Sequence, residues 1–151
     1  MIKQLDNTDK NVKLLTKYLH LVDNDFGIPL SENTELESYA LKLLAKGVVL
    51  VFVERNEFAG LVAGYCNDSV DGNAIISLLS TRNEYRGQGI SRQLIYCMID
   101  ICHNASMKRI LVDSINPSAV NIYLSCGFNI VKKETVGGRI RTFLKLQFVE
   151  Q

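Results

Sequence analysis

The sequence predicts a mixed α+β fold, in which a central, mostly antiparallel sheet of about seven strands carries helices on both faces. Two observations predict this fold. Segments with apolar residues at helical spacing are interspersed among alternating or β-branched apolar runs along the whole chain. Several of these runs follow one another with no helix between them, unlike the strict alternation of a doubly wound fold. The expected element order is β-α-α-β-β-β-α-β-α-β-β.

The chain is expected to begin with an edge strand at residues 2–6. A helix follows, and Thr8 or Asp9 supplies its N-terminal cap because a short polar side chain can accept a bond from a free backbone amide. The apolar stripe of this helix consists of Val12, Leu15, Leu19 and Val22.

Residues 23–30 are predicted to form a loop, because Gly27 and Pro29 interrupt any regular pattern. Ser31 precedes several acidic residues, a combination typical of a helix start. A second helix is therefore expected to open at Ser31 and to end at Gly47. Its apolar stripe consists of Leu36, Tyr39, Ala40, Leu43 and Leu44.

The middle of the chain changes from helical to strand periodicity. Residues 48–53 form a β-branched apolar run of the kind found in buried strands. A turn at 55–57 leads into a hairpin partner at 58–66. After a polar turn at 68–73, another strand is expected at 74–81.

A long amphipathic helix is predicted to begin at Gly89. Its buried face consists of Ile90, Leu94, Ile95, Met98 and Cys102. A short strand at 109–113 follows. Asn116 and Pro117 then favour the start of a last helix, as cap and first helical residue, and Gly127 is expected to end it in a left-handed conformation. The closing strands are expected at 129–136 and 140–148, with a glycine pair as the turn.

The length and composition of the chain exclude several classes of protein. A chain of 151 residues without a linker, repeat or composition break predicts one domain over residues 1–151. The formal net charge of +1 argues against a dedicated nucleic-acid binder. The N-terminus lacks the apolar region of a signal peptide, and the longest apolar run, 48–53, is far short of the ~20 residues that span a membrane. We therefore expect a cytoplasmic protein without a membrane partner.

Cysteine spacing gives no metal signature. The four cysteines form no C-x-x-C pair and have no histidine at ligand-like spacing, so reduced thiols and no bound metal are expected. They are Cys66, Cys97, Cys102 and Cys126.

The strongest local signal is a glycine-containing loop between a strand and the long helix. Glycines let the backbone approach a ligand closely, the helix N-terminus adds partial positive charge, and an arginine and a serine add further donors. Such a loop suits a phosphate or pyrophosphate. Its residues are Arg86, Gly87, Gln88, Gly89, Ile90 and Ser91.

Other phosphate loops match less well. No Gly-Lys-Ser/Thr of a P-loop occurs, and Arg92 stands where a dinucleotide loop needs its third glycine. A glycine-rich turn that merely joins strand to helix stays open when the loop is considered alone.

A second motif follows the strand at 109–113, at the start of the last helix: Asn116, Ala119, Tyr123, Gly127 and Phe128. Together with the glycine loop, in which Ser91 replaces the usual small Gly or Ala, it resembles the two motifs of the GNAT N-acetyltransferase superfamily. The resemblance covers roughly residues 48–146. It implies a GNAT-like fold and an N-acetyltransferase that moves an acetyl group from acetyl-CoA, its co-substrate, to a primary amine by direct attack in a ternary complex.

The resemblance also implies roles for particular residues. The glycine loop would bind the cofactor pyrophosphate, and Asn116 would both cap its helix and reach the cofactor. Backbone amides exposed by a bulge at Leu79, Ser80 and Thr81 would face the acyl-pantetheine. Tyr123 would be the catalytic residue, as general acid or as a group that orients the sulfur.

The general base and the acceptor are left open. The carboxylates of the expected cleft are Glu84, Asp113, Asp68 and Asp25. In the family, acceptor choice depends on the segments that are here 23–31 and 136–141. A small amine, an amino sugar or sugar nucleotide, and a protein N-terminus all fit. The alternative function is an acyl-CoA-binding regulatory domain without turnover. A homodimer is compatible with the sequence, which does not decide it.

Overall fold

The computed structural model describes residues 1–149, so the last two residues of the expected domain, 1–151, lie outside it. The strands are β1 (Ile2–Gln4), β2 (Val48–Glu54), β3 (Glu57–Tyr65), β4 (Asn73–Thr81), β5 (Arg109–Ser114), β6 (Asn129–Val136) and β7 (Arg139–Gln147). The helices are α1 (Asp9–Val22), α2 (Leu36–Lys46), α3 (Ile90–Asn104) and α4 (Pro117–Ser125), with 3-10 turns η1 (Asp23–Phe26), η2 (Leu30–Glu32) and η3 (Asn83–Tyr85). The expected order of strands and α-helices is confirmed.

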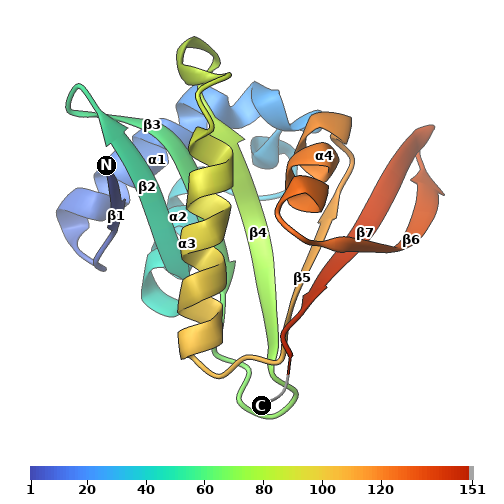
Figure 1. Ribbon diagram of the computed structural model, residues 1–151. Coiled ribbons are helices and arrows are strands. Elements are labelled where there is room, and N and C mark those ends of the chain that lie inside the picture. Colours follow the sequence, from blue (N-terminus) through green and yellow to red (C-terminus); the bar gives the residue numbers. More distant parts are fainter. Residues whose placement is uncertain (150–151) are drawn as a thin grey trace.

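The strands form one sheet in the order β1-β2-β3-β4-β5-β7-β6 (Figure 1). All neighbours are antiparallel except β4 and β5, which are parallel. This parallel pair joins only residues 73–75 to residues 109–111. Beyond it, towards the carboxyl ends, β4 and β5 are no longer paired with each other. The mixed, mostly antiparallel sheet that the sequence predicts is therefore confirmed.

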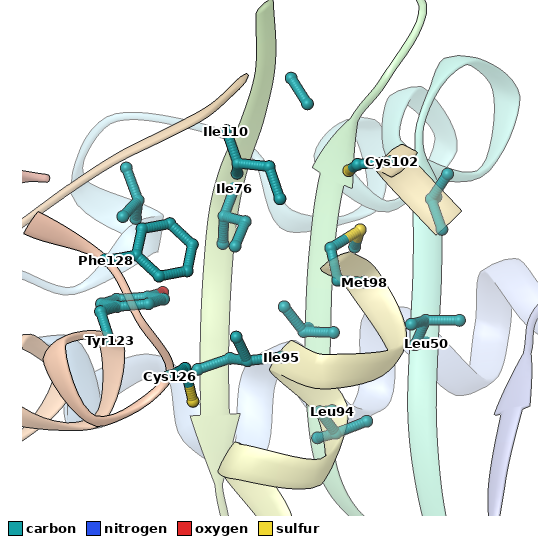
Figure 2. Packing of buried hydrophobic residues seen from close by; sticks show 14 of the residues in the cluster. Leu50, Ile76, Leu94, Ile95, Met98, Cys102, Ile110, Tyr123, Cys126 and Phe128 are labelled. Atoms are coloured by element: carbon teal, nitrogen blue, oxygen red, sulfur yellow. The ribbon is translucent and has the colours of Figure 1, made fainter. Parts of the chain in front are cut away.

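Helices cover both faces of the sheet. α1 and α2 pack against one face, where Leu15, Leu19 and Leu43 are completely buried. α3 and α4 belong to the core of the other face, in which Leu94 and Ile95 of α3 are also completely buried. Figure 2 shows this second core, where the α3 side chains meet those of β4, β5 and α4. All five stripe residues predicted for α3 are buried, so the helical periodicity located its inner face correctly.

The start of the second helix is a correction to the sequence-based expectation. Ser31 does not open α2, because its amide and its hydroxyl both donate to the carboxylate of Asp23. These two bonds close the loop after α1 and leave residues 30–32 as a 3-10 turn. The cap of α2 is Glu35, whose carboxylate accepts from the amides of Glu37 and Ser38. The helix therefore begins five residues later than expected, at Leu36.

The residues predicted to start α1 and to end α4 do so. The hydroxyl of Thr8 accepts from the amide of Asn11 at 3.1 Å and caps α1. Gly127 follows α4 with φ of +99°, a left-handed conformation that glycine adopts without a steric penalty.

The four cysteines are free. Among residues 1–149, no helix is long and apolar enough to cross a membrane.

Candidate active site

A cleft of about 410 Å³ opens where β4 and β5 separate. One wall comes from β4 and another from the end of β5 and the start of α4. The segment between α1 and α2 covers a third side, and one side chain of β7 reaches in. The lining residues are Phe26, Ile28, Pro29, Leu30, Asn33, Thr34, Tyr39, Ile76, Ser77, Leu78, Leu79, Val112, Asp113, Ser114, Ile115, Asn116, Ala119, Tyr123 and Arg141.

A β-bulge shapes the β4 wall. Ala63 of β3 pairs with Leu78, whereas the next residue, Gly64, pairs with Ile76, so Ser77 has no partner opposite it. A side chain on Gly64 would collide with the carbonyl of Ile75, because a Cβ there would lie 2.2 Å from that oxygen. Glycine thus lets the two strands approach where the ladder is broken.

The bulge corrects one expectation drawn from the family resemblance. It lies at Ser77, before the predicted positions 79–81, which pair with β3 in regular register. It also changes which face successive side chains occupy, because one extra residue shifts the alternation by one. Ile76 belongs to the core under α3, whereas Leu78 belongs to the core under α1 and α2. Gly64, near the end of β3, was the available sequence signal.

The three predicted residues of β4 have different surroundings. Leu79 lines the cleft. The hydroxyl of Ser80 is buried on the opposite face and shares a 3.0 Å hydrogen bond with the hydroxyl of Tyr18. The hydroxyl of Thr81 shares a 2.5 Å hydrogen bond with that of Ser91, at the start of α3. Among the three, only Leu79 contributes its side chain to the cleft.

The glycine loop is open and its helix end is uncapped. Gly87 and Gly89 have φ of +80° and +77°, and no atom in the described part of the chain lies within 4 Å of a Cβ built on either. Gly89 is the N-cap of α3 and supplies no side-chain acceptor, and the first turn of α3 has no acidic residue. Side chains cap the other three α-helices. The first amides of α3 are therefore available to an anion.

The remaining loop residues divide into donors and packing residues. The guanidinium of Arg86 donates from Nε to the carbonyl of Thr81 at 3.1 Å and lies 3.7 Å from the carboxylate of Asp25. Gln88 is exposed. The side chain of Ile90 is buried under the sheet, where Gly60 leaves room for it, so only its backbone can face a ligand.

A polar network holds the segment that leads into the loop. The hydroxyl of Tyr85 donates to the carboxylate of Glu57 at 2.6 Å, and Arg82 forms an ion pair with the same carboxylate at 3.1 Å. The hydrogen bond from Tyr85, followed by that from Arg82, lowers the pKa of Glu57. The carboxylate therefore stays charged and ties η3 to the β2–β3 hairpin. Sequence analysis did not identify this contact.

Three residues of the second motif line the cleft: Asn116, Ala119 and Tyr123. Asn116 caps α4 by accepting from the amide of Ser118 at 2.9 Å, and it lines the cleft. Tyr123 also lines the cleft and packs against Phe128, with ring centroids 5.4 Å apart (Figure 2). Burial, and then the nearby charge of Asp113, raises the pKa of Tyr123. Its phenol is therefore protonated at neutral pH and holds its proton more firmly than a free tyrosine.

Of the four candidate carboxylates, only Asp113 lines the cleft. It forms an ion pair with Arg141 of β7, also a lining residue. The others are engaged elsewhere, since Glu84 pairs with Arg82, just before η3, Asp25 pairs with the loop arginine, and Asp68 accepts amides in the β3–β4 turn. Over residues 1–149, no cluster of three His, Cys, Asp or Glu residues could hold a metal.

Comparison with known proteins supports the family resemblance that the two motifs suggest. A family model described as an acetyltransferase (GNAT) domain matches residues 29–144. None of the curated protein sequences matches the chain significantly.

Solved structures share the fold at low sequence identity. The chain superposes on a ribosomal-protein-alanine N-acetyltransferase from Brucella melitensis with a TM-score of 0.77 and 17% identity, covering 98% of this chain and 99% of the other. An aminoglycoside 6'-N-acetyltransferase complexed with coenzyme A gives 0.80 and 11%, covering 100% and 98%. A structure from Bacillus anthracis str. Ames in complex with acetyl coenzyme A gives 0.62 and 18%, covering 69% and 64%.

These likenesses confirm the expected GNAT-like fold, and the family model covers most of the chain. An uncapped helix end, two open glycines and a cleft between separating strands fit a co-substrate with a pyrophosphate and an extended thioester arm. The chain belongs to the GNAT acetyltransferase family and is an acetyl-CoA-dependent N-acetyltransferase.

Proposed function

We propose that the chain transfers the acetyl group of acetyl-CoA directly to a primary amine within a ternary complex, in the cleft between β4 and β5. The observation that carries the proposal is the continuity of the two sites along β4. The uncapped start of α3 and its open glycines lie just beyond the end of β4, and the cleft lies beside Ser77–Leu79 of the same strand. In this proposal the same strand, β4, thus connects the site for the pyrophosphate with the site for the thioester.

In this proposal the loop binds the pyrophosphate mainly through backbone amides. Gly87 and Gly89 allow close approach, the amides of Gln88, Ile90 and Ser91 donate, and the helix dipole adds partial positive charge. Arg86 adds a full charge that its 3.7 Å partner, Asp25, shares in the free protein. If Thr81 donates to Ser91 in their mutual hydrogen bond, the Ser91 hydroxyl keeps its own proton for a phosphate oxygen.

The cleft residues are proposed to orient the thioester. The unpaired edge of β4 near Leu79, Ser80 and Thr81 offers amides to the carbonyl oxygen, where negative charge develops during attack. Asn116, the cap of α4, lines the cleft and reaches the pantetheine arm in this proposal. The chain itself therefore supplies alignment and electrostatic stabilisation.

Tyr123 is proposed to donate a hydrogen bond to the departing sulfur. A free phenol has a pKa of ~10 and a thiol ~8.5, so full proton transfer to the thiolate is uphill. Burial raises the pKa of Tyr123 further, which makes the transfer less favourable and leaves the hydrogen-bond donor intact. Its contribution is therefore stabilisation of the developing thiolate.

Asp113 is proposed to be the carboxylate that receives the ammonium form of the acceptor, because it alone of the four candidates lines the cleft. The amine must lose a proton before it attacks, and a cleft carboxylate, directly or through water, provides the path. The acceptor classes expected from the sequence are a small amine, an amino sugar or sugar nucleotide, and a protein N-terminus.

The proposal is tested by release of free thiol from acetyl-CoA over a panel of primary amines, together with isothermal titration of acetyl-CoA. Thiol release that depends on an amine, with formation of the N-acetyl product, supports it. Titration heat without turnover on any amine would instead support an acyl-CoA-binding regulatory domain. Tight ATP binding without acetyl-CoA binding would contradict the cofactor site itself.

Three further expectations stay predictions: one domain over residues 1–151, a cytoplasmic location, and a homodimer. Light scattering after size-exclusion chromatography tests the last of these directly.

A further inference from the structure

The charges that line the cleft form one pair. Among its lining residues in the described part of the chain, Asp113 and Arg141 are the charged ones. Asp113 lies directly opposite Phe143 in the β5–β7 ladder, and Arg141 lies two residues before Phe143 in β7, on the same face. The guanidinium and the carboxylate are hydrogen-bonded to each other. The pair therefore presents one guanidinium, a hydrogen-bond donor, and one carboxylate side by side in the cleft.

This pair is accessible and inexpensive to rearrange. The side chains are 33% exposed for Arg141 and 41% exposed for Asp113. Partly exposed pairs contribute little net stability, because water competes for both charges. Glu134 lies directly opposite Arg141 in the β6–β7 ladder but forms its own ion pair with Lys132 at 2.9 Å. Both members of the cleft pair can therefore exchange their mutual contact for a ligand without stranding a buried charge.

The wall that faces the pair is apolar. It consists of the segment between α1 and α2, with Phe26, Ile28, Pro29 and Leu30. Asp23 accepts from Ser31 and Asp25 pairs with Arg86, and neither carboxylate lines the cleft. The other polar lining groups are neutral. The cleft thus combines an apolar wall, one carboxylate and one guanidinium.

This combination suits one kind of acceptor. A polycation such as an aminoglycoside needs several carboxylates, whereas the lining charges here sum to zero and Arg141 would repel a second ammonium. The cavity of about 410 Å³ is at the small end of the ~300–1,000 Å³ of ligand pockets. It must also hold the thioester end of acetyl-CoA, which leaves room only for a small acceptor.

We infer that the acceptor is a small, apolar primary amine with one anionic group, whose ammonium binds Asp113 and whose carboxylate or phosphate binds the Arg141 guanidinium. The inference rests on the proposed function and names its substrate class. Arg141 is the specificity-determining residue, because a planar guanidinium binds carboxylate and phosphate oxygens in a two-point geometry.

The pair also orders the reacting groups. Asp113 and Tyr123 line the same cleft, so an amine held by Asp113 shares the cleft with the phenol that is proposed to donate to the departing sulfur. In each turnover an N–C bond forms and the C–S bond of the thioester breaks. The sulfur leaves with its electron pair. The ammonium nitrogen loses two protons in all: the first passes through Asp113 to solvent, and the second, released after attack, ends on the sulfur, so that CoA departs as the thiol.

The test compares matched amines on the intact protein, with thiol release from acetyl-CoA as the readout. L-phenylalanine is compared with 2-phenylethylamine, which lacks only the carboxylate, and with L-phenylalaninamide, which neutralises it. O-phosphoethanolamine is compared with ethanolamine to examine phosphate. Each kcat/KM is measured at one pH, and Arg141→Gln is compared with wild type on the same amine, so that differences in amine basicity cancel.

At least one anionic amine is expected to exceed its neutral counterpart by roughly 10- to 100-fold in kcat/KM, the range of a hydrogen bond to a charged group. Arg141→Gln should abolish this preference, so that the ratio of kcat/KM between the anionic amine and its neutral counterpart falls by the same roughly 10- to 100-fold. Lys133→Gln is the control, because Lys133 lies one strand over, opposite Thr142 on the other face of the hairpin; it should keep the preference.

The outcomes separate the two proposals. Neutral amines that react as well as their anionic partners would overturn the inference and leave the proposed function standing. A preference that survives in Arg141→Gln would also overturn it. Failure of every amine to release thiol would contradict amine acetylation itself, and with it the inference.

Discussion

Gly89 offers the sharpest test of the phosphate loop, because its substitution separates backbone strain from ligand binding. Gly89 has φ of +77°, and a Cβ built on it meets no described atom within 4 Å. Alanine therefore fits sterically within the protein. It carries only the cost of a left-handed backbone, ~1–2 kcal/mol for a residue with a Cβ, together with any loss of the space that the loop leaves open.

Gly138 is a matched control at the β6–β7 turn. Its φ is +76°, and the space around its Cβ position is equally open. Both Gly89→Ala and Gly138→Ala should lose ~1–2 kcal/mol of unfolding free energy, which at this chain length lowers Tm by about 2–8 °C. The strain is thus the same in both variants, and any further difference comes from the loop.

Only Gly89→Ala should weaken acetyl-CoA binding. The methyl group projects into the open space in front of the first amides of α3, where the pyrophosphate is proposed to bind. Losing one hydrogen bond to a charged group, ~1.5–3 kcal/mol, raises the acetyl-CoA KM by about 10- to 100-fold. Steady-state kinetics with varied acetyl-CoA, alongside calorimetric melting, measures both effects. Equal acetyl-CoA KM values for the two variants at equal Tm loss would refute the assignment of this loop.

Three other predictions concern single side chains. Arg86→Ala should raise the acetyl-CoA KM about tenfold with a smaller effect on kcat, and an unchanged KM would remove its guanidinium from the phosphate site. Tyr123→Phe should lower kcat about 10- to 100-fold with little change in acetyl-CoA KM; unchanged turnover would exclude Tyr123 from the chemistry. Burial raises the pKa of Tyr18 to about 12, so its contribution to stability is full below pH 10 and is lost as the pH rises towards 12, by about 2–3 kcal/mol. Chemical denaturation should show a loss of stability above pH 10 that is larger in wild type than in Tyr18→Phe by about this amount, because the other buried groups with raised pKa values, such as Tyr123, are common to both proteins. Equal losses in the two proteins would contradict it.

Local periodicity was enough to locate most of the secondary structure. Each buried residue of the apolar stripe of α3 was predicted, because apolar residues recur every three to four positions along an amphipathic helix and mark its buried face. The capping role of Asn116 was equally local. The expectation that Ser31 opens a helix was wrong because of a less local contact. The carboxylate of Asp23, eight residues earlier, accepts from both the amide and the hydroxyl of Ser31. A good capping residue can be satisfied by another partner, and the sequence does not reveal which.

The cleft depends on contacts between distant segments. The pairing of Asp113 with Arg141 requires the register of β5 against β7, which no local pattern specifies. The bulge at Ser77 had a signal in Gly64, but only the pairing of β3 with β4 shows that the two meet. The two motifs therefore pointed to the loop and Tyr123, which stay predictions as site residues, whereas the pairing of the two charges that line the cleft became visible only in three dimensions.

The central claim is that the loop from Arg86 to Ser91 binds the cofactor pyrophosphate at the open end of α3. The most direct measurement is a titration of the isotope-labelled protein with coenzyme A, followed through its assigned backbone amide NMR signals. The account predicts the largest shifts at the amides of residues 87–91, with smaller shifts along residues 79–81. Saturable binding that leaves the amides of Gly87, Gly89 and Ser91 unmoved would contradict it.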